Sequence, residues 1–140
     1  MSNNLYNILV PVDFTGKNKW AITKAIELSN SFNCNIHLVY VAGKNQSLFL
    51  RDSNSEVALK KLEQVKARYQ KQLCGEGTLE ISVLRGNKQK QLTSYIKQYE
   101  MDLVVTGLSK FNVVQRIISS VSISRLAKKT NIPVLAIRSG

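Results

Sequence analysis

The sequence predicts an α/β fold, an open doubly wound sheet of five parallel strands with helices on both faces. Two observations lead to this fold class. Short, nearly all-apolar runs alternate with stretches whose apolar residues recur at helical spacing, and mostly short turns join them. Such alternation is typical of βαβ units around a parallel sheet. With 140 residues, the chain has the length of one ordinary domain, and we expect residues 1–140 to form it.

The first βαβ unit is expected between residues 7 and 41. Residues 7–12 form an apolar run, which is typical of a strand buried on both faces, and Asp13 follows it. The next apolar residues recur at spacings that place them on one helical face: Ala21, Ala25, Leu28 and Phe32. Asn33 closes this helix, and residues 34–41 are again nearly all apolar, as in a central strand.

A polar loop over residues 42–54 is expected to lead into a second amphipathic helix. Its apolar positions are Ala58, Leu62, Val65, Tyr69 and Leu73. Gly75 and Gly77 end this helix. Residues 79–83 then alternate between apolar and polar, so the third strand is expected to expose one face and to lie at an edge of the sheet.

The rest of the chain predicts two further helices and two further strands. A glycine-asparagine pair at 86–87 supplies a turn and a helix cap. The apolar positions of the helix that follows are Leu92, Ile96 and Tyr99. Residues 103–106 form the fourth strand, which Gly107 ends. Apolar residues then predict a helix or broken helix within 114–131, and residues 134–137 form the fifth strand.

The formal net charge of +11 is the outlier of the composition, and it is unevenly spread. No acid follows Asp102. The segment after it carries Lys110, Arg116, Arg125, Lys128, Lys129 and Arg138. Its field attracts phosphate groups, nucleic acid or an acidic protein surface. A solvated basic face that keeps the protein soluble is the alternative interpretation.

The sequence indicates a soluble, cytoplasmic protein. The apolar run at 8–12 is too short for a signal peptide, and polar residues interrupt every hydrophobic segment before the roughly 20 residues that a membrane-spanning helix needs. Cys34 and Cys74 lie far apart without a CxxC spacing, so we expect buried free thiols and neither a disulfide nor a zinc site. His37 is the only histidine, and its apolar strand favours a structural role.

Ligands of doubly wound sheets bind at the carboxyl ends of the strands, where Asp13 and Gly107 fall. No catalytic set accompanies them, because the sequence lacks a GxxxxGK[ST] loop, a GxSxG elbow and an HExxH motif. We therefore expect a binding protein and not an enzyme. Nucleic-acid binding is indicated by charge alone, since Trp20, Tyr95 and Tyr99 fall at helical positions that packing explains.

Three stretches resemble the universal stress protein family, over nearly the whole chain. Residues 7–15 read NILVPVDFT, close to the family's opening ILVPVDFS. Residues 102–107, DLVVTG, resemble its DLIVMG strand, and residues 131–138, NIPVLAIR, resemble its closing CPVLVVR. The resemblance implies an adenine nucleotide alpha-hydrolase-like fold with strand order 3-2-1-4-5, a role in the stress response, and a homodimer through the last strand.

Members of this family that bind ATP carry a loop of glycine, two residues, glycine, nine residues, glycine, and then serine or threonine. Gly107 holds the first position, but Lys110, Ser120 and Val121 occupy the other three. A side chain at a glycine position obstructs the approach of backbone N–H groups to phosphate, and Val121 lacks the hydroxyl. The resemblance therefore implies weakened or lost ATP binding.

The resemblance also implies roles for individual residues. Asp13 would contact the adenine or the ribose, Pro11 and Val41 would border the base, and Gly107 would donate its N–H to phosphate. Asp13 has a structural interpretation as well, because an acid at the end of a strand can order the turn into the following helix. Both interpretations of Asp13 remain open at this point.

A modified phosphate site is an alternative to the loss of ATP binding. Lys110 places a cation where phosphates would lie, and Ser120 and Ser122 offer hydroxyls beside an expected helix start. The leading hypothesis is a homodimeric stress-response binding module with weakened or lost ATP binding. The alternatives are a sensor of ATP, AMP or a related adenine nucleotide, and a basic adaptor for nucleic acid or an acidic protein.

Overall fold

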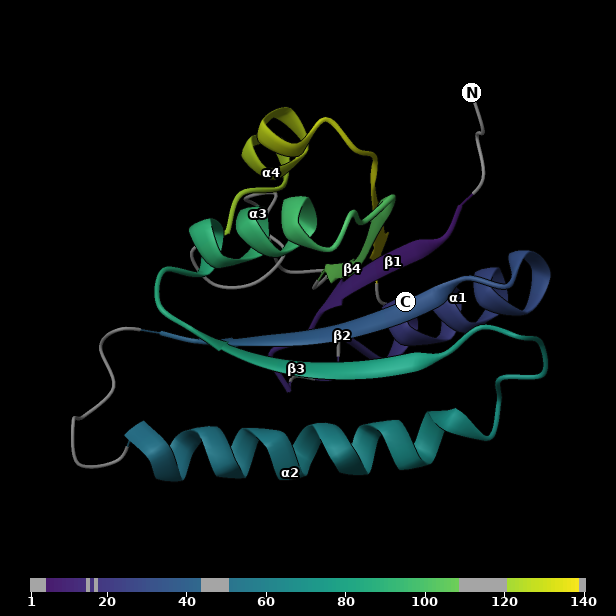
Figure 1. Ribbon diagram of the computed structural model, residues 1–140, viewed down its shortest axis with the longest axis horizontal. Coiled ribbons are helices and arrows are strands. Elements are labelled where there is room, and N and C mark those ends of the chain that lie inside the picture. The colour runs from purple at the N-terminus through teal and green to yellow at the C-terminus, as the bar shows by residue number, and fades with distance from the viewer. Residues whose placement is uncertain (1–4, 15, 17, 44–50, 109–120, 139–140) are drawn as a thin grey trace.

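The structure is a computed structural model that describes residues 5–14, 16, 18–43, 51–108 and 121–138. Strands and helices alternate in the expected order: β1 (Asn7–Pro11), α1 (Asn18–Phe32), β2 (Asn35–Ala42), α2 (Arg51–Gln70), β3 (Leu79–Arg85), α3 (Lys88–Gln98), β4 (Leu103–Leu108), α4 (Ile123–Thr130) and β5 (Val134–Arg138). The sheet is the middle of three layers, with α1 and α2 on one face and α3 and α4 on the other (Figure 1).

The sheet has the predicted topology. All strand pairs are parallel, and the strands lie in the order β3-β2-β1-β4-β5. β1 pairs with β2 along its whole length, from Asn7↔Asn35 to Pro11↔Val39. Helices cover β1 on both faces, which explains why its sequence is a continuous apolar run. β3 lies at one edge, as its alternating pattern predicts, and β5 lies at the other.

The face that α1 buries differs in part from the predicted one. Ala21 and Ala25 are buried as expected, but Phe32 is 61% exposed. The helix instead buries Ile22 and Ile26 beside the alanines. The buried stripe is therefore shifted to one side, and Phe32, at the last position of the helix, lies beyond it. The apolar spacing alone could not separate these two neighbouring stripes.

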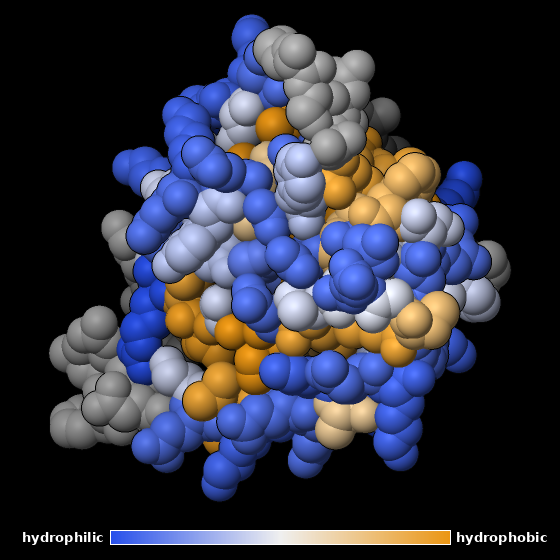
Figure 2. Space-filling model, turned by 45° about the vertical axis from the view of Figure 1, so that its right-hand side comes forward, coloured by the Kyte–Doolittle hydropathy of each residue, from blue (hydrophilic) through white to orange (hydrophobic). Residues whose placement is uncertain are grey.

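α2 follows its predicted amphipathic pattern. Ala58, Leu62 and Tyr69 are buried against the sheet, and Val65 is half-buried. Its outer residues are mostly polar, and the lower edge of the molecule in Figure 2, where α2 lies, is correspondingly hydrophilic. The helix begins at Arg51, inside the loop predicted over 42–54. Its first turn is polar, so no apolar periodicity marked where the helix starts.

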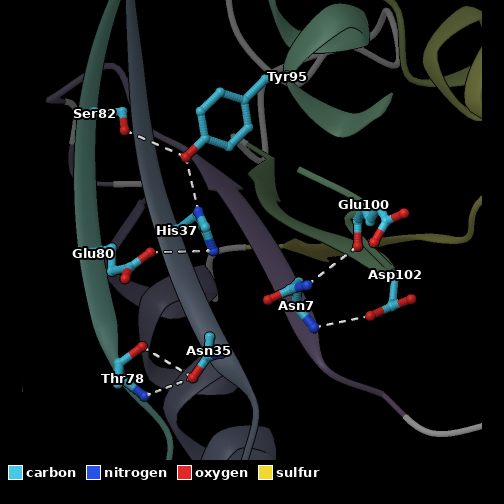
Figure 3. Close-up of polar contacts among 9 residues, drawn as sticks. All are labelled: Asn7, Asn35, His37, Thr78, Glu80, Ser82, Tyr95, Glu100 and Asp102. Carbon is cyan, nitrogen blue, oxygen red and sulfur yellow. Dashed lines mark hydrogen bonds and ion pairs between the residues drawn. The ribbon is translucent and has the colours of Figure 1, made fainter. Parts of the chain in front are cut away.

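Three asparagines fasten the connection between α2 and β3. The side-chain oxygens of Asn30, Asn33 and Asn35 accept hydrogen bonds from backbone N–H groups of residues 74–78 at 2.9 to 3.2 Å. The Thr78 hydroxyl also donates to Asn35, at 3.0 Å, as Figure 3 shows. The end of α1 and the start of β2 thus hold a segment more than forty residues away in the sequence.

A second set of polar contacts fixes the start of β1 (Figure 3). The Asp102 carboxylate accepts hydrogen bonds from the backbone N–H groups of Tyr6 and Asn7 at 3.0 and 2.9 Å. The Asn7 side chain donates to the carbonyl oxygen of Glu100 at 3.3 Å. These contacts pin the amino end of β1 beside that of β4, so the two strands start together.

The two thiols have different surroundings. Cys34 is buried and donates from Sγ to the carbonyl oxygen of Leu5 at 3.2 Å. Burial raises the pKa of the Cys34 thiol, which keeps it protonated and unreactive. Cys74 is free but exposed, so the prediction of a second buried thiol is wrong. It lies in the connection after α2, where Asn30 holds its backbone N–H while its side chain faces solvent.

Within the described part of the chain, no helix is both long enough and apolar enough to cross a membrane. The same residues contain no group of three or more histidine, cysteine, aspartate or glutamate side chains that could hold a metal ion.

Candidate functional site

β1 and β4 separate toward their carboxyl ends. β1 pairs with β4 only at Ile8↔Leu103 and Leu9↔Val104, whereas its pairing with β2 continues to Pro11. The chain leaves β1 toward the α1 side of the sheet and leaves β4 toward the α4 side. This is the topological switch point of a doubly wound sheet, where ligands of such folds bind. The sequence placed Asp13 and Gly107 at this edge, but only the pairing register shows that the strands part here.

Three residues at this edge share the sheet face that α3 and α4 cover. Val41 packs in the core cluster of that face, together with Leu9 of β1 and Val104 of β4. Because alternate residues of a strand share a face, Pro11 and Thr106 belong to it as well. Both are buried. Two of the predicted base-bordering residues, Pro11 and Val41, thus lie on one face of adjacent strands.

Thr106 is a site residue that sequence reasoning missed. Its side chain is 1% exposed, and its Oγ1 makes no hydrogen bond to the described residues or to solvent. A buried hydroxyl without a partner costs about 1–3 kcal/mol, so such a group marks a place where a ligand can supply the missing contact. The available signal was a polar residue within the apolar run 103–106.

Asp13 follows β1 and is engaged with the start of α1. Its Oδ1 accepts a hydrogen bond from Asn18 Nδ2 at 2.9 Å. Asn18 is the first residue of α1 and is 5% exposed. This contact agrees with the structural interpretation of Asp13, because it orders the turn that leads into the helix. A contact between Asp13 and a nucleotide stays a prediction.

The predicted phosphate-binding positions are only partly described. Gly107 lies inside β4, opposite Ile137 of β5, so the predicted end of this strand is wrong. Glycine is a poor indicator of a strand end where a neighbouring strand continues the ladder. Lys110 and Ser120 lie outside the described residues. Val121 is fully buried in the core cluster of the α3 and α4 face.

Ser122 caps α4, as its place beside an expected helix start suggested. Its hydroxyl accepts a hydrogen bond from the Arg125 N–H at 3.3 Å, and its own N–H donates to Gln89 Oε1 at 2.8 Å. Gln89 is a buried residue of α3, and it too was missed by sequence reasoning. The two contacts fix the start of α4 against α3, next to the carboxyl end of β4.

His37 belongs to a polar chain under α3, seen in Figure 3. Its Nδ1 lies 2.8 Å from the Tyr95 hydroxyl, which lies 3.3 Å from the Ser82 hydroxyl, and its Nε2 lies 3.5 Å from Glu80. Burial lowers the pKa of His37, although Glu80 opposes this shift. A neutral ring with its proton on Nε2 accepts from Tyr95 and donates toward Glu80, so both nitrogens are satisfied. The predicted structural role of His37 agrees with this arrangement.

The lowered pKa of His37 predicts that acid destabilises the fold. The unfolded chain takes up a proton on this residue near its ordinary pKa of 6.5, whereas the folded chain resists it. Below that pH the unfolded state binds more protons, so the free energy of unfolding falls. We expect the urea midpoint to drop between pH 7.5 and 5.5, and to drop less in His37→Gln. Equal pH dependence in both proteins would contradict this assignment.

Comparison with known proteins gives one family. The sequence model described as "Universal stress protein family" matches residues 5–138. The universal stress protein UspA from Lactobacillus plantarum superposes with a TM-score of 0.73 and is 24% identical, covering 98% of this chain and 100% of its own. No curated protein is significantly similar in sequence.

Two similar solved structures contain nucleotides according to their descriptions. A universal stress protein family protein from Arabidopsis thaliana with AMP bound has a TM-score of 0.70 and 17% identity, covering 96% of this chain and 92% of its own. A universal stress protein from Archaeoglobus fulgidus in complex with dAMP has a TM-score of 0.62 and 15% identity, covering 94% of this chain and 97% of its own. At these identities the likeness is one of fold.

Proposed function

The chain belongs to the universal stress protein family, and from this premise we propose that it is a regulatory domain that binds an adenine nucleotide of the AMP type without converting it. The observation that carries the proposal is the crevice at which β1 and β4 part. Pro11 and Val41 offer apolar surface for a base there, and the Thr106 hydroxyl lacks a partner. The nucleotides in the Arabidopsis and Archaeoglobus proteins support this choice of ligand.

The preference for a monophosphate follows from the phosphate side of the crevice. Lys110 and Ser120 replace two glycines of the loop motif, so backbone N–H groups have less access to a polyphosphate. Val121 stands where the motif has a hydroxyl, and it is used for core packing instead. The β- and γ-phosphates of ATP therefore gain little binding energy here. We propose a regulatory role without turnover, since no catalytic motif accompanies the site.

The test is a calorimetric titration of the full chain with AMP and with ATP. We expect AMP to bind and ATP to bind no more than about threefold more tightly, because the phosphate loop adds little. The double variant Lys110→Gly with Ser120→Gly should improve ATP binding selectively. The proposal fails if neither nucleotide binds at millimolar concentration. It also fails if wild-type ATP binding exceeds AMP binding by tenfold or more.

We also propose that two copies associate through β5. This strand lies at the edge of the sheet, and Leu135 within it is 39% exposed. An exposed apolar edge strand needs covering or pairing. Light scattering after size exclusion should give twice the 15.7 kDa of one chain. Leu135→Lys should shift the protein to the single-chain mass, whereas Val57→Lys, on an exposed position of α2, should not. A wild-type protein of 15.7 kDa at tens of micromolar would refute the dimer.

A further inference from the structure

A cavity of about 390 Å³ lies between α1 and α2, beside the carboxyl end of β1. Volumes of this size are usual for small-molecule sites. None of the residues predicted to bind a nucleotide lines it. Val12 and Ile22, which do line it, pack in the core cluster of the α1 and α2 face, whereas Val41 packs in the cluster of the opposite face. The cavity is therefore distinct from the β1–β4 crevice.

The wall that α2 contributes is one helical face. Lys61, Gln64, Val65, Arg68 and Tyr69 recur at intervals of three, one, three and one, so they stand together along the helix. Two of the five are cations and two present apolar or aromatic surface. This face was predicted from its apolar members alone, as a stripe for core packing. The cations at its margin were not part of that prediction.

The charge of the cavity has one sign. Lys19 of α1 faces the same space as Lys61 and Arg68, and no carboxylate is among the lining residues. No ion pair joins any of these three cations to a carboxylate in the described part of the chain. The cavity also adjoins the first turn of α1, which carries no acid and whose helix dipole favours an anion.

The apolar part of the cavity is held in an unusual way. Phe14 has a φ of 64°, a conformation that aromatic residues seldom adopt and that costs about 1–3 kcal/mol. Its ring contacts that of Tyr40, with centroids 4.8 Å apart, and the Lys61 ammonium lies 5.3 Å from its centroid. A cation thus lies directly next to an aromatic wall. Val65 and Tyr69 supply further apolar surface.

We propose that this cavity binds a small aromatic anion, one or two rings that carry a carboxylate or a phosphate. The rings lie against Phe14, Val65 and Tyr69, and the anionic group lies between Lys61 and Arg68. Uncompensated cations beside dry apolar surface favour such a ligand over a neutral one, because a neutral ligand leaves the cations without a counter-charge. A polar anion such as free phosphate leaves the apolar wall uncovered.

The test uses 2-naphthoate and 2-naphthyl phosphate as probes, with 2-naphthamide as the neutral match. We expect at least one anion to bind the full chain in calorimetry at least tenfold more tightly than the amide. Lys61→Gln with Arg68→Gln should weaken that binding at least tenfold. The matched control is Lys60→Gln with Lys71→Gln, two exposed residues on the same side of the sheet that do not line the cavity and remove the same charge. It should change the affinity less than twofold.

Three outcomes overturn the proposal. They are the absence of binding by both anions at millimolar concentration, an equal loss in the control pair, and competition by AMP, which would place the probe in the crevice. Should the double variant fail to fold, Gln64→Trp serves in its place, since Gln64 is exposed at the cavity and a large ring there obstructs it. Unchanged probe binding in Gln64→Trp would also overturn it.

Discussion

Replacing Gly77 by alanine should lower the free energy of unfolding by about 1–3 kcal/mol, at the upper end of that range. A Cβ at this position would overlap the carbonyl oxygen of Cys34 and the hydroxyl of Ser29. The Ser29 hydroxyl donates to that same carbonyl at 2.7 Å, so moving either group disturbs a buried hydrogen bond. The backbone of residues 74–78 cannot retreat without loosening the asparagine contacts that hold it.

The measurement is the midpoint of urea unfolding at constant slope, compared with Gly43→Ala. A Cβ on Gly43 meets nothing within 4 Å, so we expect that control to change the stability by no more than about 0.5 kcal/mol. Equal stabilities of the two variants would show that the approach of Gly77 to Cys34 is not tight, contrary to the contacts described above.

Asp13→Ala should weaken AMP binding by about 10- to 100-fold. A hydrogen bond to a charged carboxylate contributes about 1.5–3 kcal/mol, which corresponds to that range of affinity. The expectation rests on the proposed function, because the contact seen in the structure is the one to Asn18 at 2.9 Å. Loss of that contact also loosens the turn before α1, so the same variant should be modestly less stable.

Asp13→Asn and Asn18→Ala separate the two roles. Asparagine at 13 keeps an oxygen that can accept from Asn18, so it should preserve the turn while it removes the charge. Asn18→Ala breaks the contact and leaves the carboxylate. If Asp13 contacts the nucleotide, affinity falls with Asp13→Asn more than with Asn18→Ala. If Asp13 only orders the turn, the ranking is reversed, and the nucleotide contact is then wrong.

Much of the candidate site was predictable because its residues follow strands. Asp13 and Gly107 stand at the carboxyl ends of buried strands, where parallel sheets present ligands. Pro11 and Val41 followed from the family resemblance, and the structure places them on one face. Thr106 and Gln89 were not found. Their importance depends on what surrounds them, a missing partner in one case and the start of α4 in the other.

The sequence by itself determined the kind and order of the elements and the parallel, doubly wound sheet. Those features follow from apolar periodicity, which is local along the chain. Only the tertiary structure decided that Phe32 and Cys74 are exposed, that Gly77 meets Cys34, and that β1 and β4 part after two residue pairs. It also decided that α1 and α2 enclose a cationic cavity. Each of these depends on contacts between segments far apart in the sequence, and a pattern within one segment cannot report which neighbour lies across the gap.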